Sequence, residues 1–192
     1  STPVSCFGGN DGTTTITVTG GTTPYSYLWD VTAGNQGDST ATGLPAGNYL
    51  ATVTDANSCI AVLSNAVTVT EPQQALAVTL TINDVSCNGG SDGIINAAVT
   101  GGTGSYAYQW NNSQTTSGIS GLTANNFSLS VTDNNNCMET IQAAILEPAA
   151  LSINTSSSSV SCFGFSDGSC EAVVGGGVSA YNYLWNNLVI TE

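Results

Sequence analysis

The sequence contains no lysine, no arginine and no histidine, and these absences remove several classes of function. Affinity for nucleic acid comes chiefly from lysine and arginine contacts with phosphate, so we expect no nucleic-acid partner. Docking on an anionic membrane surface depends on the same side chains. Histidine is the usual general base and the usual nitrogen ligand of metals, and lysine is needed for Schiff bases. The sequence therefore predicts a protein that is not an enzyme and that carries no cofactor.

Charge and long apolar runs are scarce as well. Only 7% of the residues are charged, all 13 of them are acidic, and the formal net charge is −13. No apolar stretch is long enough to cross a bilayer and no signal peptide is recognisable, so we expect no direct membrane insertion. The content of β-branched and aromatic residues is higher than in a disordered acidic tail. We interpret the sequence as a folded piece of a longer protein, because it starts and stops inside a repeated unit.

One pattern recurs three times along the chain. Each copy begins with Val-Ser-Cys, passes through Asp-Gly and ends in Tyr-x-Tyr-x-Trp, with 23 residues from the cysteine to the tryptophan. The copies start 81 and then 75 residues apart, a period that suits a small β-domain better than a solenoid coil. We predict three repeats: residues 1–72, which lack the first strand, residues 73–148, which are complete, and residues 149–192, which are the first part of a third.

Nearly every periodic segment alternates between apolar and polar residues with period two, which is typical of half-buried strands. Each complete repeat contains roughly seven such segments, with a turn signal about every ten residues. The sequence thus predicts an all-β fold, a tandem array of small immunoglobulin-like antiparallel β-sandwich domains of about 75–80 residues each. We expect Trp29, Trp110 and Trp185 to lie in the cores, with an exposed aromatic platform for a ligand as the alternative.

Each complete repeat has one early and one late cysteine, which indicates a disulfide framework formed in an oxidising compartment. The expected pairs are Cys6 with Cys59 and Cys87 with Cys137. Closing a loop of about 50 residues would stabilise each domain by about 4 kcal/mol in the chain-entropy model. Zinc is the alternative, but the sequence has neither Cys-x-x-Cys nor histidine.

The third repeat has the early cysteine, Cys162, and a further one, Cys170. Cys170 aligns with Thr14 and Ile95, eight residues after the early cysteine. We predict it to be a small buried side chain. A bond to Cys162, or to a cysteine beyond Glu192, is the alternative.

An Asp-Gly pair follows each early cysteine and contains Asp11, Asp92 or Asp167. Asp-Gly is a strong turn signal, because glycine adopts positive φ and the aspartate side chain bonds nearby backbone groups. Calcium bound by these three aspartates is the alternative, since no lysine competes for them. The density of ligands is low, with no Asp-x-Asp-x-Asp run. We therefore favour turn-forming carboxylates and no metal.

Taken together, the recurring segments resemble the SprB repeat, which builds very long cell-surface adhesins of gliding bacteria in the Bacteroidota. The resemblance rests on Val-Ser-Cys-Phe-Gly-Gly-Asn-Asp-Gly, Thr-Gly-Gly-Thr, Tyr-x-Tyr-x-Trp, Gly-Leu-Pro-Ala-Gly-Asn-Tyr and Val-Thr-Asp-Ala-Asn-Ser-Cys, and it covers essentially all of the chain. It implies export by the type IX secretion system, display on the bacterial cell surface, and adhesion to substrata during gliding. Asp38-Ser39-Thr40 resembles the O-glycosylation signal of that phylum, which implies Ser39 as a modified residue.

The combined prediction is a non-enzymatic stalk segment of a long secreted adhesin. Its partners would be other repeats of the same chain, and then surface polysaccharide, the substratum or neighbouring chains. One alternative is a glycan-binding module that uses the loop after Trp29 or Trp110. Another is a subunit of an extracellular filament or sheath, which ordered lateral contacts between chains would reveal. An enzyme is the weakest hypothesis, because no nucleophile–base pair can be assembled without histidine or lysine.

Overall fold

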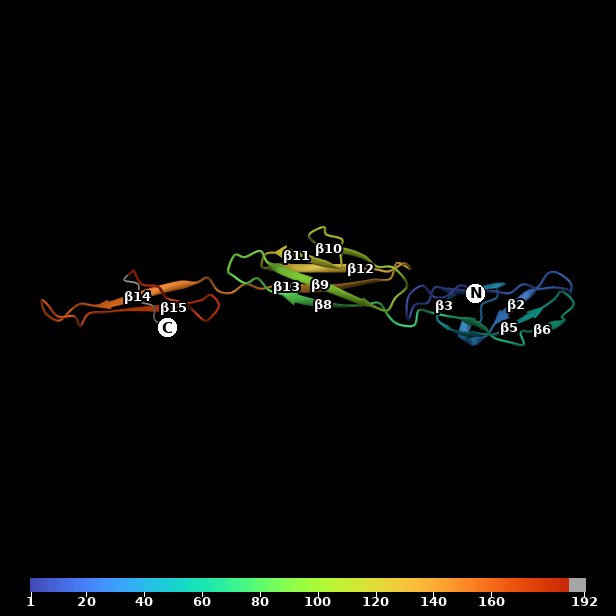
Figure 1. The fold of residues 1–192 in the computed structure, drawn as a ribbon. Helices are drawn as coiled ribbons and strands as arrows, with labels where there is room; N and C mark the ends of the chain where they lie inside the picture. The colour runs from blue at the N-terminus through green and yellow to red at the C-terminus, as the bar shows by residue number, and fades with distance from the viewer. Residues whose placement is uncertain (187–192) are drawn as a thin grey trace. The chain divides into compact units, whose positions relative to one another are not determined.

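The structure is a computed structural model in which residues 1–186 are described (Figure 1). Apart from one short 3-10 turn, η1 (Val31–Ala33), the regular elements in this range are β-strands, which confirms the all-β prediction. Residues 187–192, the end of the predicted third repeat, lie outside the described residues. The strands of the first repeat are β1 (Gly12–Thr15), β2 (Ser26–Trp29), β3 (Thr40–Leu44), β4 (Gly47–Tyr49), β5 (Ala51–Thr54), β6 (Ile60–Val62) and β7 (Val67–Val69). Those that follow are β8 (Ala77–Asn83), β9 (Gly93–Thr100), β10 (Ala107–Trp110), β11 (Gly118–Leu122), β12 (Asn125–Thr132), β13 (Met138–Ile145), β14 (Ser152–Ser158) and β15 (Ser169–Gly175).

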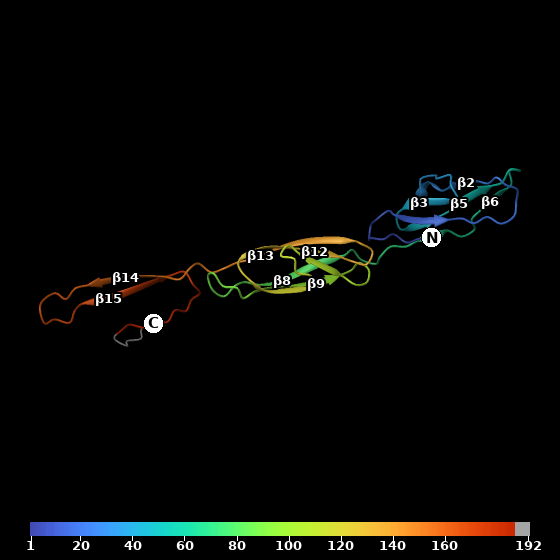
Figure 2. The ribbon, with the colours of Figure 1, turned by 90° about the horizontal axis from the view of Figure 1, so that it is seen from above.

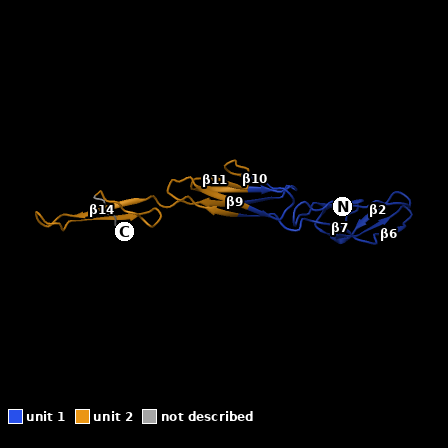
Figure 3. Ribbon diagram, viewed as in Figure 1, with its two compact units in different colours: residues 1–79, 98–109, 130–141 blue, residues 80–97, 110–129, 142–192 orange. Residues whose placement is uncertain are grey.

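Contacts between residues divide the chain into two compact units (Figure 3). Unit 1 holds residues 1–79, 98–109 and 130–141, and unit 2 holds residues 80–97, 110–129 and 142–192. The linkers between successive repeats, near residues 72 and 148, therefore lie inside unit 1 and unit 2 respectively. This division does not test the repeat boundaries, which stay predictions.

The first repeat folds as small antiparallel sheets around one apolar core. β1 pairs with β3, β4 pairs with β7, and β5 lies between β2 and β6. Trp29 at the end of β2 is opposite Ala51 at the start of β5. The buried hydrophobic cluster consists of Val4, Trp29, Ala33, Ala41, Leu44, Tyr49, Ala51 and Val69.

The second repeat has longer strands in two three-stranded sheets. β9 lies between β8 and β11, and β12 lies between β10 and β13. Figures 1 and 2 label β8, β9, β12 and β13 of this repeat. Along β12, alternate residues are buried, as expected for a strand with one face on the core. Both sheets contribute buried residues, which agrees with the predicted sandwich. The buried hydrophobic residues on these strands are Ile95, Trp110, Ile119, Leu122, Phe127, Leu129, Val131, Ala143 and Ile145.

The third repeat is described as the antiparallel pair β14–β15 and the segment that follows it to residue 186. Trp185, predicted to be a core residue, is only half-buried, and Cys170, predicted to be buried, is exposed. These two predictions are wrong for the described residues. In the first two repeats the positions equivalent to Cys170, Thr14 and Ile95, are paired with β3 and β11, which follow the tryptophan. The corresponding positions of the third repeat lie beyond residue 186.

Thr14 provides a test of the first core. It is 0% exposed, and its Oγ1 is buried without a hydrogen-bond partner in the described part of the chain. A buried hydroxyl without a partner costs about 1–3 kcal/mol. Thr14→Val keeps the shape and removes the hydroxyl, so we expect it to raise the free energy of unfolding by about 1 kcal/mol in urea denaturation. Thr15→Val is the control, because the exposed Thr15 hydroxyl already bonds Thr40. A loss of stability in Thr14→Val would contradict the prediction.

Candidate functional site: the cysteine turns

Each early cysteine lies in a turn that an aspartate closes; we call the segment from Ser5 to Gly12, and its equivalents, the early-cysteine turn. Asp11 Oδ1 accepts the Ser5 N–H at 2.9 Å, and the Ser5 hydroxyl bonds the same carboxylate. The Gly9 N–H donates to the Cys6 carbonyl at 2.9 Å. The equivalent aspartate bonds join the Ser86 N–H to Asp92 and the Ser161 N–H to Asp167, each at 3.0 Å. All three Asp-Gly aspartates thus hold a turn in their own repeat.

The structure does not gather these aspartates into a metal centre. Each carboxylate is engaged by the serine of its own turn. Among residues 1–186, no three His, Cys, Asp or Glu side chains are grouped so that they could hold a metal ion. The turn-forming interpretation is the one that this geometry supports.

We expect the fold to lose stability in acid. The bond from the serine hydroxyl, followed by that from the serine N–H, holds the pKa of Asp11, Asp92 and Asp167 below the ordinary value of about 3.9. A lowered pKa means that the folded state binds fewer protons than the unfolded state. The stabilisation is therefore complete above about pH 4 and is lost as the pH falls through the folded-state pKa.

Thermal unfolding between pH 7 and pH 2.5 measures this effect. Acid also removes self-repulsion from a chain with a net charge of −13, which acts in the opposite direction. Asp92→Asn is therefore the matched comparison, and its melting temperature should depend less on pH than that of the unmodified chain. Equal slopes below pH 4 would contradict the prediction.

A glutamate at the end of each of the first two repeats closes the same turn from the other side. The Gly8 N–H donates to Glu71 Oε2 at 2.5 Å, and the Gly89 N–H donates to Glu147 Oε2 at 2.7 Å. Each glutamate stands directly before the proline of the linker. The linker therefore starts from a residue fixed on the early-cysteine turn. Recurrence of Glu-Pro was the sequence signal that could have revealed this role.

Each late cysteine lies in a second turn, the late-cysteine turn (residues 55–59 and 133–137), which is also built around an aspartate. Asp133 is 5% exposed, and its Oδ1 accepts the N–H groups of Asn135 and Cys137, both at 2.9 Å. Its Oδ2 accepts the Thr103 N–H at 2.8 Å. Three backbone donors thus compensate a buried charge in a chain without basic side chains.

The same turn forms in the first repeat around Asp55. The Asn57, Cys59 and Thr22 N–H groups donate to its carboxylate at 2.9, 2.8 and 3.0 Å. These bonds, that of Cys59 first, hold the pKa of Asp55 below its ordinary value. The exact spacing of Val-Thr-Asp-x-Asn-x-Cys in both repeats was the signal for this structural role.

The disulfide joins an early-cysteine turn to a late-cysteine turn of the next repeat. Cys6 is bonded to Cys137, with 5.7 Å between the Cα atoms, which is within the usual range. Cys59, Cys87, Cys162 and Cys170 are free and exposed. The predicted pairs Cys6–Cys59 and Cys87–Cys137 are therefore wrong.

The length of one strand gives the physical reason. In the second repeat the early-cysteine turn precedes β9, and Asp133 ties the late-cysteine turn to Thr103, just past the other end of β9. β9 has 8 residues, which span about 27 Å at ~3.4 Å per residue. The Cα atoms of a disulfide lie within about 7 Å. The two cysteines of one repeat therefore stand at opposite ends of it.

Further contacts support the junction around the disulfide. Asn135 Nδ2 donates to the Ser5 carbonyl oxygen at 2.8 Å, and the Cys137 sulfur lies 3.4 Å from the same oxygen. All of these residues belong to unit 1. The late-cysteine turn of the second repeat thus docks directly on the early-cysteine turn of the first.

The linkers are also held by the Gly-Gly turn of the repeat that follows them. The Gly102 N–H donates to the Gln74 carbonyl at 3.0 Å, and the Gly177 N–H donates to the Ala149 carbonyl at 2.7 Å. Gly101 has φ of +70°, and a Cβ atom there would lie 1.9 Å from the Ala75 oxygen. Glycine is required at this position both for its conformation and for the close approach of the linker.

Gly101→Ala should loosen the linker between the first two repeats. The positive φ alone costs about 1–2 kcal/mol for a residue with a Cβ atom, and displacement of the Ala75 carbonyl adds to this. Gly20→Ala is the matched control, because Gly20 has φ of +80° in the equivalent turn but no atom near its Cβ position. We expect Gly101→Ala to show faster hydrogen exchange across residues 73–77 than Gly20→Ala. Equal exchange in both variants would count against the linker contact.

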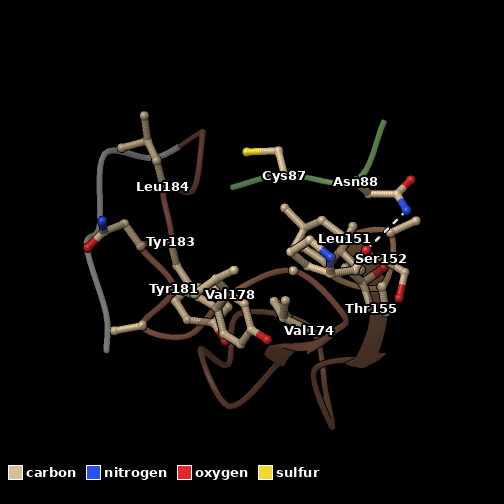
Figure 4. Close-up of a pocket in the computed structure, with 18 of the residues that line it drawn as sticks. Cys87, Asn88, Leu151, Ser152, Thr155, Val174, Val178, Tyr181, Tyr183 and Leu184 are labelled. Atoms are coloured by element: carbon tan, nitrogen blue, oxygen red, sulfur yellow. Dashed lines mark hydrogen bonds between the residues drawn. The ribbon is translucent and has the colours of Figure 1, made fainter. Parts of the chain in front are cut away.

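An open cavity of about 830 Å³ lies in unit 2 beside the second early-cysteine turn (Figure 4). Cys87 and Asn88 lie on one side of it, and Val178 and Tyr181 lie on the other. Asn88 Nδ2 donates to the Pro148 carbonyl at 3.0 Å, which fixes the turn on the linker. Much of the lining is apolar side chain of the third repeat, including Leu151, Ile153, Val174 and Trp185. Of these residues, Trp185 corresponds to the core residues Trp29 and Trp110 of the first two repeats.

The remaining predicted residues lie apart from these turns. Trp29 and Trp110 are 0% and 1% exposed, and their Nε1 atoms donate to the Asp38 and Thr116 carbonyls, both at 2.9 Å. They are core residues rather than a ligand platform. Ser39 is half-buried just before β3, and its carbonyl accepts the Ile16 N–H at 2.9 Å. Its glycosylation stays a prediction.

Comparison with models of protein families shows to which family the chain belongs. A family model described as SprB repeat matches residues 1–34, 79–115 and 154–189, together more than half of the sequence. The chain belongs to the SprB repeat family. Each matched segment of these SprB repeats contains an early cysteine and the tryptophan 23 residues later. The family assignment made from the recurring motifs is thereby confirmed.

The other comparisons add little about these SprB repeats. The chain is similar to a solved structure titled "Structure of amphioxus IgVJ-C2 molecule", at 11% identity and a TM-score of 0.34, over 76% of this chain and 99% of that one. At this TM-score the likeness carries no weight, and the all-β assignment rests on the sheets themselves. No curated protein matches the sequence. None of the described residues forms a helix of the length and apolarity needed to span a membrane.

Proposed function

We propose that this chain is a non-enzymatic stalk segment of a long secreted adhesin on the bacterial cell surface, serving attachment or gliding. The observation that carries the proposal is the presence of three SprB repeats, two of which are joined by a disulfide. A disulfide agrees with an extracellular location, because cytosolic thiols are kept reduced. The contacting partners of each repeat would be its neighbours in the chain.

The chemistry of the recurring turns supports a spacer rather than a binding site. The aspartates of both kinds of turn accept backbone N–H groups of their own repeat. These aspartates therefore hold the turns that lie at the junctions between repeats. The acidic surface would keep neighbouring stalks apart by repulsion.

Replacement of the repeats in the cell tests this proposal. Residues 1–148 would be deleted from the parent protein, or exchanged for an unrelated tandem of β-sandwich domains with a similar span. Antibodies on intact cells would measure display, and attachment to glass would measure function. A spacer predicts that the deletion weakens attachment and that the unrelated tandem restores it. Attachment restored only by the original repeats would instead indicate a glycan-binding module, and absence of labelling on intact cells would contradict surface display.

A further inference from the structure

The disulfide between Cys6 and Cys137 joins elements that are present again elsewhere in the chain. The early-cysteine turn forms in all three repeats, with the same serine–aspartate bond. The N–H three residues after the cysteine closes it on the cysteine carbonyl each time, at 2.9 to 3.1 Å from Gly9, Gly90 and Phe165. Cys87 and Cys162 therefore lie in turns with the same hydrogen bonds as the turn of the bonded Cys6.

The late-cysteine turn of the first repeat matches the bonded one of the second in detail. Asn57 Nδ2 donates to Thr22 Oγ1 at 3.1 Å, as Asn135 Nδ2 does to Thr103 Oγ1 at 3.3 Å. Asn135 Nδ2 also bonds the Ser5 carbonyl of the preceding repeat. Cys59 is thus held in the geometry that Cys137 has, together with an asparagine able to make the same contact.

Exposure separates the bonded cysteines from their free counterparts. Cys6 and Cys137 are half-buried, whereas Cys87 and Cys59 are exposed. The difference follows from what faces each turn. The second late-cysteine turn covers Cys6, and Cys87 instead borders the open cavity beside the third repeat.

The chain path across both linkers is fixed in the same way. A glutamate ties the start of each linker to the early-cysteine turn before it, and a Gly-Gly turn holds its end. Both junctions therefore present an early-cysteine turn to the repeat that follows.

We propose that the disulfides of this array are staggered, each running from the early cysteine of one repeat to the late cysteine of the next. Cys87 is then the cross-linking site for the late cysteine of a following repeat, and Cys59 is the site for the early cysteine of a preceding one. The partner is a further SprB repeat, recognised by the serine carbonyl and the asparagine amide beside the sulfur atoms. This pairing does not depend on the adhesin role.

Each link forms by oxidation of two thiols. The cysteines lose two protons and two electrons as the S–S bond forms, and the disulfide of a thiol–disulfide oxidoreductase takes these up and becomes two thiols. Such an oxidant acts in the compartments where exported proteins fold.

Peptide mapping without reduction tests the pairing in the chain itself. Free thiols are alkylated, the chain is cut with chymotrypsin and an Asp-specific protease, because it has no trypsin sites, and the fragments are identified by mass spectrometry. We expect the Cys6 fragment to be joined to the Cys137 fragment, with Cys59 and Cys87 alkylated. A fragment that joins Cys6 to Cys59, or Cys87 to Cys137, overturns the proposal.

Completion of the third repeat tests the stagger directly. A copy of residues 113–148 is joined after residue 187, which places a late cysteine in the third repeat. The expected result is that Cys87 is joined to this added cysteine and is no longer alkylated, while the Cys6–Cys137 link is kept. In the control extension with serine in place of the added cysteine, Cys87 should be alkylated. Alkylation of Cys87 in the first extension, with the Cys6–Cys137 link intact, overturns the proposal.

Discussion

Cys137→Ser is expected to lower the free energy of unfolding of the first two repeats by about 5 kcal/mol. The disulfide that it removes joins residues 131 positions apart, and closure of so long a loop removes much conformational freedom from the unfolded chain. Cys6→Ser should have the same effect, because it removes the same bond. The measurement is denaturant unfolding under oxidising conditions, followed by tryptophan fluorescence from Trp29 and Trp110.

The exposed cysteines provide the controls for this experiment. Cys59→Ser and Cys87→Ser should change stability little, since both thiols are free and exposed. A reducing agent should bring the unmodified chain to the stability of Cys137→Ser and leave Cys137→Ser itself unchanged. If Cys59→Ser were as damaging as Cys6→Ser, the bond would lie within the first repeat.

Trp110→Ala should be the most damaging single change outside the disulfide. The side chain is 1% exposed, and Nε1 donates to the Thr116 carbonyl at 2.9 Å. Truncation of a buried tryptophan removes a large apolar contact area and leaves a cavity, which costs about 3–5 kcal/mol. The loss of the indole N–H also leaves the Thr116 carbonyl without this donor. We expect a lower melting temperature and faster proteolysis of the second repeat.

Two further variants separate the contributions to this effect. Trp110→Phe keeps most of the apolar contact and loses the hydrogen bond, so its cost should be clearly smaller. Trp185→Ala is the matched change in the third repeat, where the tryptophan is half-buried, and it should be milder still. A cost for Trp185→Ala equal to that of Trp110→Ala would show that the two positions are equally packed.

The strands and the burial of Trp29 and Trp110 could be predicted because they depend on local pattern. Alternation over residues 125–132 fixes which side chains of β12 face inward, and the structure buries Phe127, Leu129 and Val131 accordingly. The Asp-Gly turns follow from the conformational freedom of glycine and from the short reach of aspartate. None of these features requires knowledge of contacts distant in the sequence.

The disulfide could not be predicted from spacing, because spacing does not show at which end of a domain each turn lies. The loop from Cys6 to Cys59 is shorter than that from Cys6 to Cys137, but loop-closure entropy depends only weakly on length. What decides the pairing is the strand that separates the two turns of one repeat. The bonds from Thr22 to Asp55 and from Thr103 to Asp133 show this arrangement, and they join residues about 30 positions apart.

The bond between Cys6 and Cys137 also changes how the protein would respond to pulling. Tension applied between Ser1 and a residue after Cys137 passes through the sulfur atoms and bypasses the intervening chain. Those 131 positions, which would extend to about 450 Å at ~3.3–3.6 Å per residue, cannot lengthen the molecule while the bond is intact. The chain between the two cysteines, which includes Trp29 and Trp110, therefore carries no tension, and only reduction of the bond makes its length available. Val4 and β13, which contribute buried residues to the two cores, lie outside the loop and stay under tension.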